Sequence, residues 1–168
     1  TLWNKTNNWM AAHGLPPKFA LAISEARSDK GHRGKPPWDD AYGMSPVNYL
    51  KLDSVPSVDD MSSIINALKS GEYFMTTGEI LIPHYEIQGE GNERTIIAEL
   101  EWTFPLDFVE VVWGDGEKTG REVISASDLP PFGKKRFEIP FDARGKKWVR
   151  FAAWDVAMNG ALVQPVGL

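Results

Sequence analysis

The sequence predicts an α+β protein in which a helical and loop-rich segment precedes an antiparallel β-sandwich of about seven strands. Three observations lead to this fold class. Apolar residues recur at helical spacing in two stretches before residue 72. From about residue 73 they alternate with polar residues, which is the period of a half-buried strand. Turn signals separate the alternating stretches, and we therefore divide the chain into residues 1–72 and 73–168.

Two helices are expected in the first segment. One spans residues 2–13 and stops before Gly14, which suits the left-handed conformation at a helix end. The other is the clearer one, because Ser57 is placed to cap its start, Asp60 follows three residues later and Gly71 ends it. Its apolar stripe comprises Val58, Met61, Ile64, Ile65 and Leu68.

Short strands complete the prediction. Residues 19–23 form an apolar run typical of a buried strand, and residues 47–52 form another. The glycine- and proline-containing residues 24–46 between them indicate a long loop. The alternating stretches of the second segment are 73–76, 79–87, 95–102, 108–113, 136–141 and 148–154. An Asn159-Gly160 turn then closes a hairpin of the kind found in Ig-like sandwiches.

Composition narrows the classes of function. The formal net charge of −5, without a basic cluster, argues against a nucleic-acid partner. No apolar run approaches the roughly 20 residues of a membrane helix, so no membrane partner is expected. The absence of cysteine excludes disulfides and cysteine-ligated zinc, and it fits exported and cytosolic proteins alike. We favour a bacterial periplasmic or extracellular location over a cytoplasmic one, although these residues contain no signal peptide pattern.

Several short segments of the sequence resemble segments of a known protein family. They are ALKSG at 67–71, YFMTTGEIL at 73–81, EWTFPL at 101–106, WVRFAAWD at 148–155, NGA at 159–161 and QPV at 164–166. By these phrases the chain resembles the C-terminal region of bacterial PHP-superfamily metal-dependent hydrolases, in the branch related to carbaryl hydrolase. The resemblance implies that residues 1–72 form the end of a PHP-type barrel, and that residues 73–168 form an accessory β-sandwich domain.

The resemblance also implies a divalent metal, zinc, manganese or iron, in the intact parent protein. There the metal would activate water for attack on an ester- or phosphate-like substrate. Residues 28–32, SDKGH, are one residue longer than the Ser-Asp-x-His ligand pattern of the family, and they make Glu25, Asp29 and His32 the candidate metal ligands. The alternative is a solvated loop whose interleaved basic side chains pair with the acids. Since the His-x-His motif of the family is missing, we expect no cofactor and no complete catalytic site in this chain.

The seven tryptophans raise an alternative function. Trp148, Arg150 and Trp154 share one face of a predicted strand, and two exposed indole rings there would stack on sugar rings in a carbohydrate-binding module. Arg150 stacked between the rings is a structural alternative. Burial against the first segment is the commoner fate of tryptophan, because its side chain buries a large area. The exposure of these rings therefore distinguishes the two functions.

We therefore expect a non-catalytic fragment whose partner is the missing N-terminal barrel portion of its parent. Without that barrel, the apolar side chains that it would cover are left in solvent. Those side chains belong to Trp3, Trp9, Phe19 and Leu21. Large exposed apolar patches rarely persist on monomers, so copies of the chain are expected to self-associate.

Overall fold

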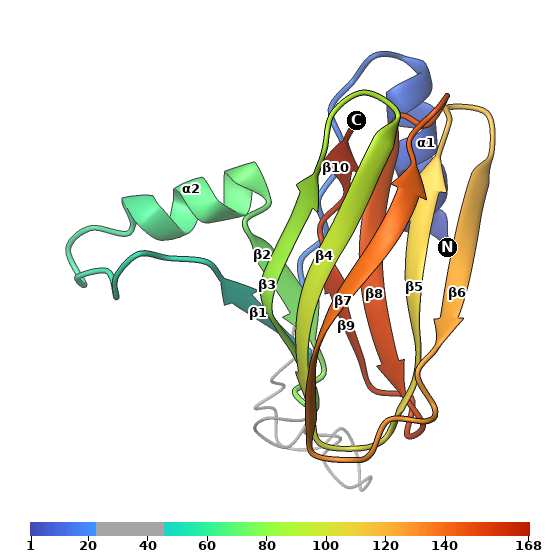
Figure 1. The fold of residues 1–168 in the computed structure, drawn as a ribbon. Coiled ribbons are helices and arrows are strands. Elements are labelled where there is room, and N and C mark those ends of the chain that lie inside the picture. The colour runs from blue at the N-terminus through green and yellow to red at the C-terminus, as the bar shows by residue number, and fades with distance from the viewer. Residues whose placement is uncertain (23–45) are drawn as a thin grey trace, which may run out of the picture.

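The computed structural model describes residues 1–22 and 46–168. Within these residues, two helices accompany ten strands that form a seven-stranded and a three-stranded sheet (Figure 1). Every strand pair in both sheets is antiparallel. The molecule is a β-rich α+β domain, and this part of the predicted fold class is confirmed.

The large sheet has the spatial order β1-β2-β9-β8-β5-β6, with β10 paired to the start of β8. Its strands are β1 (Val47–Leu50), β2 (Tyr73–Thr76), β5 (Leu106–Gly114), β6 (Thr119–Ser125), β8 (Trp148–Asp155), β9 (Gly160–Val163) and β10 (Val166–Gly167). The small sheet has the order β3-β4-β7. Its strands are β3 (Ile80–Gln88), β4 (Glu93–Trp102) and β7 (Gly133–Asp142).

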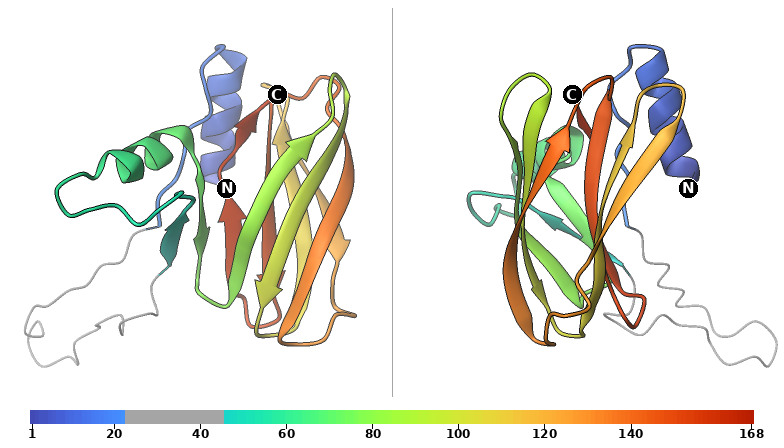
Figure 2. Two further views of the ribbon diagram at one scale, coloured as in Figure 1. Left: turned by 60° about the vertical axis from the view of Figure 1, so that its left-hand side comes forward. Right: turned by 45° about the vertical axis from the view of Figure 1, so that its right-hand side comes forward.

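The hydrophobic core lies between the two sheets, which face each other as two layers (Figure 2). It is built from the alternate residues that the sequence pattern assigned to one face of each strand. Positions with no exposed surface include Ile96, Ala98 and Leu100 on β4, and Val149, Phe151 and Ala153 on β8. Because successive side chains of a strand point to opposite faces, this alternation fixes which face of each sheet is buried.

The helix α1 (Leu2–Ala12) covers the outer face of the large sheet, against β5, β6 and β8 (Figures 1 and 2). It begins at Thr1, whose hydroxyl oxygen accepts the backbone N–H of Asn4 at 3.2 Å. It ends just before Gly14, which has a φ of 68°. The helix predicted over 2–13 is therefore confirmed to within one residue. The predicted boundary at residue 72 falls between β1 and β2, which pair with each other.

The helix α2 (Ser62–Ser70) projects away from both sheets (Figure 1). The prediction that it begins at Ser57 is wrong, because the carbonyl of Ser57 accepts the N–H of Asp60 in a turn before the helix. Asp60 supplies a side-chain bond at the start instead, since its Oδ1 accepts the N–H of Ser62 at 2.9 Å. Gly71, with a φ of 78°, ends the helix as predicted.

Two strand predictions also differ from the structure. Residues 19–22, the described part of the predicted strand 19–23, join no ladder. Their backbone bonds to side chains instead: the N–H of Ala20 donates to Gln164 Oε1, and that of Ala22 donates to Asn48 Oδ1, both at 2.9 Å. The strand β6 was missed, because this edge strand is mostly exposed and shows little apolar alternation. The described helices include none with the length and apolarity needed to cross a membrane.

Candidate functional site

The predicted metal ligands Glu25, Asp29 and His32 lie outside the described residues. Within residues 1–22 and 46–168, no three His, Asp or Glu side chains are grouped so as to hold a metal ion. The metal prediction therefore stays a prediction about a segment that these residues do not include.

Trp148 and Arg150, two of the residues of the carbohydrate alternative, lie on the outer face of the large sheet, under α1. Their exposed fractions are 1% and 3%. The indole of Trp148 lies against Gly114 of β5, where a Cβ would be 2.3 Å from Trp148 Nε1 and 2.3 Å from Asn8 Oδ1. The sheet therefore accommodates this indole because position 114 carries no side chain.

Arg150 pairs with an acid on β5 and contacts α1 through a hydrogen bond and a cation–π contact. Its Nη1 lies 3.7 Å from Oε1 of the buried Glu110, and its Nε donates to Asn4 Oδ1 at 3.2 Å. Its guanidinium also lies over the ring of Trp3, 5.2 Å from the centroid, as a cation–π contact. Burial lowers the pKa of Arg150 and the carboxylate of Glu110 opposes that shift. Arginine keeps its charge at physiological pH, so the contact persists there.

Trp154, the third residue of this group, is half-buried. Its Nε1 donates to Glu110 Oε1 at 3.5 Å, and its ring is tilted against Phe108 with the centroids 6.4 Å apart. Because Trp148 and Arg150 are covered, the three residues do not present the pair of exposed rings that a carbohydrate platform requires. Their arrangement favours a structural role: Trp148 and Arg150 lie against α1, and Trp154 packs on β5.

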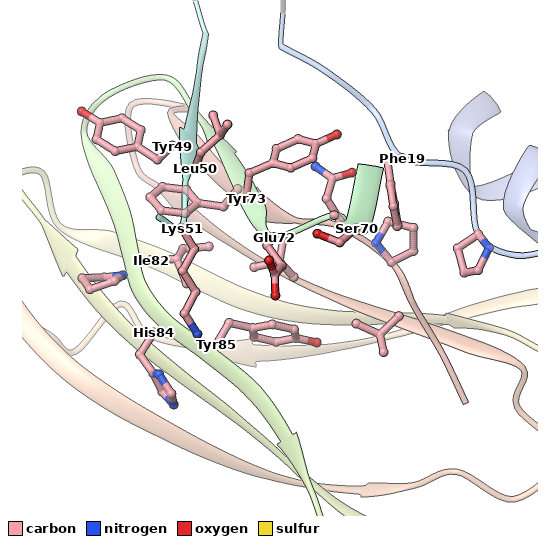
Figure 3. A pocket seen from close by; sticks show the side chains of 18 of the residues that line it. Phe19, Tyr49, Leu50, Lys51, Ser70, Glu72, Tyr73, Ile82, His84 and Tyr85 are labelled. Atoms are coloured by element: carbon pink, nitrogen blue, oxygen red, sulfur yellow. The ribbon is translucent and has the colours of Figure 1, made fainter. Parts of the chain in front are cut away.

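A pocket opens between the two sheets, where β1, β2 and β9 face β3 (Figure 3). Its volume is about 520 Å³, which is the size of a small-molecule site. Phe19 closes one side and packs over Gly71, where a Cβ would lie 2.7 Å from the phenyl ring. We take this pocket as the candidate functional site, since it is hollow, partly polar and lined by several elements.

Aromatic rings form much of its wall. Tyr49 of β1 and Phe74 of β2 stack with centroids 5.2 Å apart and planes inclined by 10°. They meet because the register of the two strands places Tyr49 opposite Phe74. The hydroxyl of Tyr73 donates to the carbonyl of Ala20 at 2.8 Å, which fixes the position of that ring.

Two polar side chains of the lining have buried atoms without a hydrogen-bond partner among the described residues: Gln164 Nε2 and the hydroxyl of Tyr85. Gln164 is 3% exposed, and its Oε1 accepts the N–H of Ala20, so its Nε2 is the unused donor. Tyr85 stacks on Phe151 of the core, with the centroids 6.3 Å apart. Burial raises the pKa of Tyr85 above the ordinary phenol range, so its hydroxyl stays protonated at physiological pH.

Polar side chains line the more exposed part of the pocket, where Figure 3 shows Lys51, Glu72 and His84. The backbone N–H of Lys51 donates to the carbonyl of Glu72 at 2.9 Å, which holds these two residues side by side. His84 Nε2 lies 3.3 Å from Glu86 Oε1, and both side chains are 37% exposed. Because one lysine and one glutamate lie next to each other, the mouth has no strong preference for either sign of charge.

Sequence reasoning missed this pocket. The available signal was a set of aromatic residues in predicted strands, among them Tyr49, Tyr73 and Tyr85. The periodicity of a strand assigns such residues to one face of a sheet, but it does not identify the residues from other elements that they contact. The lining residues Phe19 and Gln164 come from opposite ends of the chain, and the bond from the N–H of Ala20 to Gln164 Oε1 brings their segments together.

No family model, curated protein or solved structure matches this chain. The resemblance to PHP-superfamily hydrolases therefore stays a prediction. A hollow of this size with an aromatic wall is suited to binding a small molecule.

Proposed function

We propose that this chain is a non-catalytic accessory domain of a larger metal-dependent hydrolase. In this proposal the two sheets are an Ig-like sandwich, and residues 1–72 belong to the end of a PHP-type barrel. The family phrases at 67–81, 101–106 and 148–155 support the proposal, as do the two facing sheets. The domain would cover the edge of the barrel and shape the entrance for an ester- or phosphate-like substrate.

The exposed apolar side chains of α2 and of the chain that leads to it are the observation that carries this proposal. In the stripe predicted from the sequence, Val58 is 87% exposed, and Met61 and Ile65 are each 48% exposed. Val55, in the chain that leads to the helix, is 94% exposed. Within α2, only Ala67 is buried. Ile64 and Leu68 of the same stripe are half-buried, so the apolar side chains of this region are covered only in part.

These side chains belong to an arm, residues 47–70, whose helix projects from the sheets (Figure 1). Met61 and Ile65 are four residues apart, so they share one side of the helical turn. Burying an aliphatic side chain of this size contributes about 1.5–3 kcal/mol. Exposed apolar surfaces commonly mark sites of protein contact. The partner that the family resemblance supplies is the barrel of the same protein.

Self-association tests the docking role of the arm. We expect the sedimentation coefficient of the purified chain to rise with concentration, because copies cover each other's apolar side chains. Ile65→Glu should remove most of this rise, since a charge in the contact must be desolvated. The matched control is Val123→Glu: Val123 is 47% exposed, nearly as much as Ile65, but it lies on β6 at the opposite edge of the large sheet.

Two outcomes would contradict the docking role. One is a chain that remains monomeric across the concentration range. The other is an equal response to Ile65→Glu and Val123→Glu, which would show that added charge acts through general repulsion and not through the arm.

Metal content tests the non-catalytic part of the proposal. Elemental analysis of the purified chain, after mild loading with zinc, manganese or iron, should find far less than one ion per chain. A catalytic metal site needs at least three well-placed ligands, and the His-x-His motif of the family is missing from this sequence. Near-stoichiometric metal that is lost in both Asp29→Ala and His32→Ala would make residues 25–32 a ligand site and overturn the proposal.

A further inference from the structure

We propose that the pocket between the β1–β2 pair and β3 binds a free α-amino acid with an aromatic side chain. The side chain of the ligand lies along the aromatic wall, its ammonium group next to Glu72 and its carboxylate next to Lys51. Nothing in the accessory role requires such a site, so the inference goes beyond the proposed function and can fail or succeed independently of it. It rests on the size of the pocket, on its rings and on a pair of opposite charges.

The register of β1 and β2 places the rings and the charges on one face. Tyr49 lies opposite Phe74. Beyond them, the N–H of Lys51 donates to the carbonyl of Glu72 at 2.9 Å, which continues the same register. Because alternate residues of a strand share a face, the charged pair lies on the same face as the ring pair. Directly opposite residues are close neighbours in an antiparallel pair, so the charged pair follows the ring pair along a single wall of the pocket.

Both charges of this pair are available to a ligand. Lys51 and Glu72 are exposed, and in Figure 3 their side chains point from the β1–β2 pair toward Tyr85 on β3. Their ammonium and carboxylate groups form no ion pair with each other or with another residue in the described part of the chain. The backbone bond holds the two positions together and leaves both side-chain charges in place. This wall therefore presents a positive and a negative group side by side.

Two neighbouring charges of opposite sign select a ligand that carries both signs. An α-amino acid bears its ammonium group and its carboxylate on the same carbon atom, so it can place one next to Glu72 and the other next to Lys51. A ligand with an ammonium group alone is attracted by Glu72 and repelled by Lys51, and a ligand with a carboxylate alone meets the reverse. The pair therefore favours the amino acid over the amine and over the acid that have the same ring.

The volume and the rings define the side chain of the ligand. A volume of about 520 Å³ accommodates an amino acid as large as phenylalanine or tryptophan. The rings of Tyr49 and Phe74 stack with their planes inclined by 10°, so they present a nearly parallel pair beside the two charges. An aromatic ligand side chain gains offset stacking there in addition to the burial of apolar area, so it is favoured over an aliphatic side chain.

L-Phenylalanine is the first probe, with phenethylamine and 3-phenylpropionate as its single-charge analogues. We expect phenylalanine to shift the backbone amide resonances of Lys51, Glu72 and Phe74 in the ¹⁵N-labelled chain at neutral pH. Phenethylamine lacks the carboxylate and 3-phenylpropionate lacks the ammonium group, so each loses one ion pair and should bind about fivefold more weakly. L-Alanine keeps both charges without the ring and should bind about tenfold more weakly than phenylalanine.

Two variants assign each charge of the ligand to its partner. Lys51→Met removes the charge and should weaken the binding of phenylalanine and 3-phenylpropionate about fivefold without weakening that of phenethylamine. Glu72→Gln should weaken the binding of phenylalanine and phenethylamine about fivefold without weakening that of 3-phenylpropionate. Because both positions are exposed, neither change should unfold the chain. Lys69→Met is the matched control, since Lys69 is exposed on α2 and is not part of the pocket lining, and it should leave all three affinities unchanged.

The proposal is overturned by any of three results. The first is no shift of the three amide resonances with phenylalanine up to its solubility limit. The second is equal affinity for phenylalanine and both single-charge analogues, which would leave the charged pair without a role. The third is a response to Lys51→Met or Glu72→Gln that is the same for all three ligands or is matched by Lys69→Met. That result would mean that the net charge of the chain, and not ion pairing at this wall, governs the affinity.

Discussion

The two helices α1 and α2 differ in the side chains that they bury. On α1, Asn7 and Asn8 are buried while Leu2 is 81% exposed and Trp9 is 58% exposed. On α2 the apolar stripe is the more regular of the two, yet Ala67 is the one buried residue of the nine. The helix with the polar contact face is packed across three strands of the large sheet, whereas the helix with the apolar stripe is covered only in part.

Backbone hydrogen bonds explain the burial of amides under α1. Asn7 Oδ1 accepts the N–H of Lys18 at 2.6 Å, and Asn7 Nδ2 donates to the carbonyl of Lys18 at 3.3 Å. Asn8 Oδ1 accepts the N–H of Gly116, in the turn after β5, at 2.9 Å. A buried amide is tolerated when its partners satisfy it, and such directional bonds also fix the position of the helix.

This difference shows that an apolar stripe in the sequence identifies the side of a helix that can be buried, but not whether that side is buried. Burial itself needs a surface on the other side, and the described chain gives α2 little more than contact with β1. By contrast, α1 meets three strands of the large sheet. The same physical chemistry thus produces a fixed helix in one region and an uncovered helix in the other.

Of the changes that test this difference between the helices, removal of one buried amide side chain should have the largest effect on stability. We expect Asn7→Ala to lower the free energy of unfolding by about 2–3 kcal/mol, because the N–H and carbonyl of Lys18 both lose their partner inside the α1 contact. Asn66→Ala is the matched control, since Asn66 lies on α2 and is exposed, and it should change the unfolding free energy by no more than about 0.5 kcal/mol. Urea denaturation followed by tryptophan fluorescence measures both.

Equal effects of the two asparagine substitutions would contradict the contrast between the helices. A loss in Asn66→Ala as large as that in Asn7→Ala would mean that α2 is packed in solution. Retention of full stability in Asn7→Ala would mean that the bonds to Lys18 do not fix α1.

Most of the strands could be predicted, because a strand with one buried face alternates in sequence. The strand β2 was predicted with its observed bounds, 73–76. The strand β6 was not predicted. It lies at an edge and most of its residues are exposed, so its sequence does not need to alternate between apolar and polar residues. The start of α2 was placed wrongly at Ser57, since a serine with an acid three residues later also occurs in an isolated turn.

The candidate site could not be predicted for a different reason. Each wall residue obeys a local rule, but the pocket is a product of strand order, in which β9 lies next to β2. Alternation along one strand does not determine which strand becomes its neighbour. Gln164 has no local signal at all, because its role depends on a bond to Ala20, which lies 144 residues earlier in the chain.

The smallest expected effect concerns how the two helices begin. Hydrogen bonds from the side chain and the backbone N–H of Ser62 lower the pKa of Asp60 below 3.8. Because the folded-state pKa is the lower one, the bond contributes to stability above pH 3.8 and is lost as the pH falls through the folded-state value. The cap of α1 is the hydroxyl of Thr1, which does not titrate.

We therefore expect the amide resonance of Ser62 to titrate with a midpoint below 3.8, while that of Asn4 in α1 stays constant over the same range. Asp60→Asn keeps an oxygen acceptor for Ser62 and removes the charge, so this variant should abolish the titration at Ser62. A midpoint at or above 3.8, or a matching change at Asn4, would count against a specific bond. It would indicate that both helices respond to the net charge of the whole chain, and that the first turn of α2 is not held by Asp60.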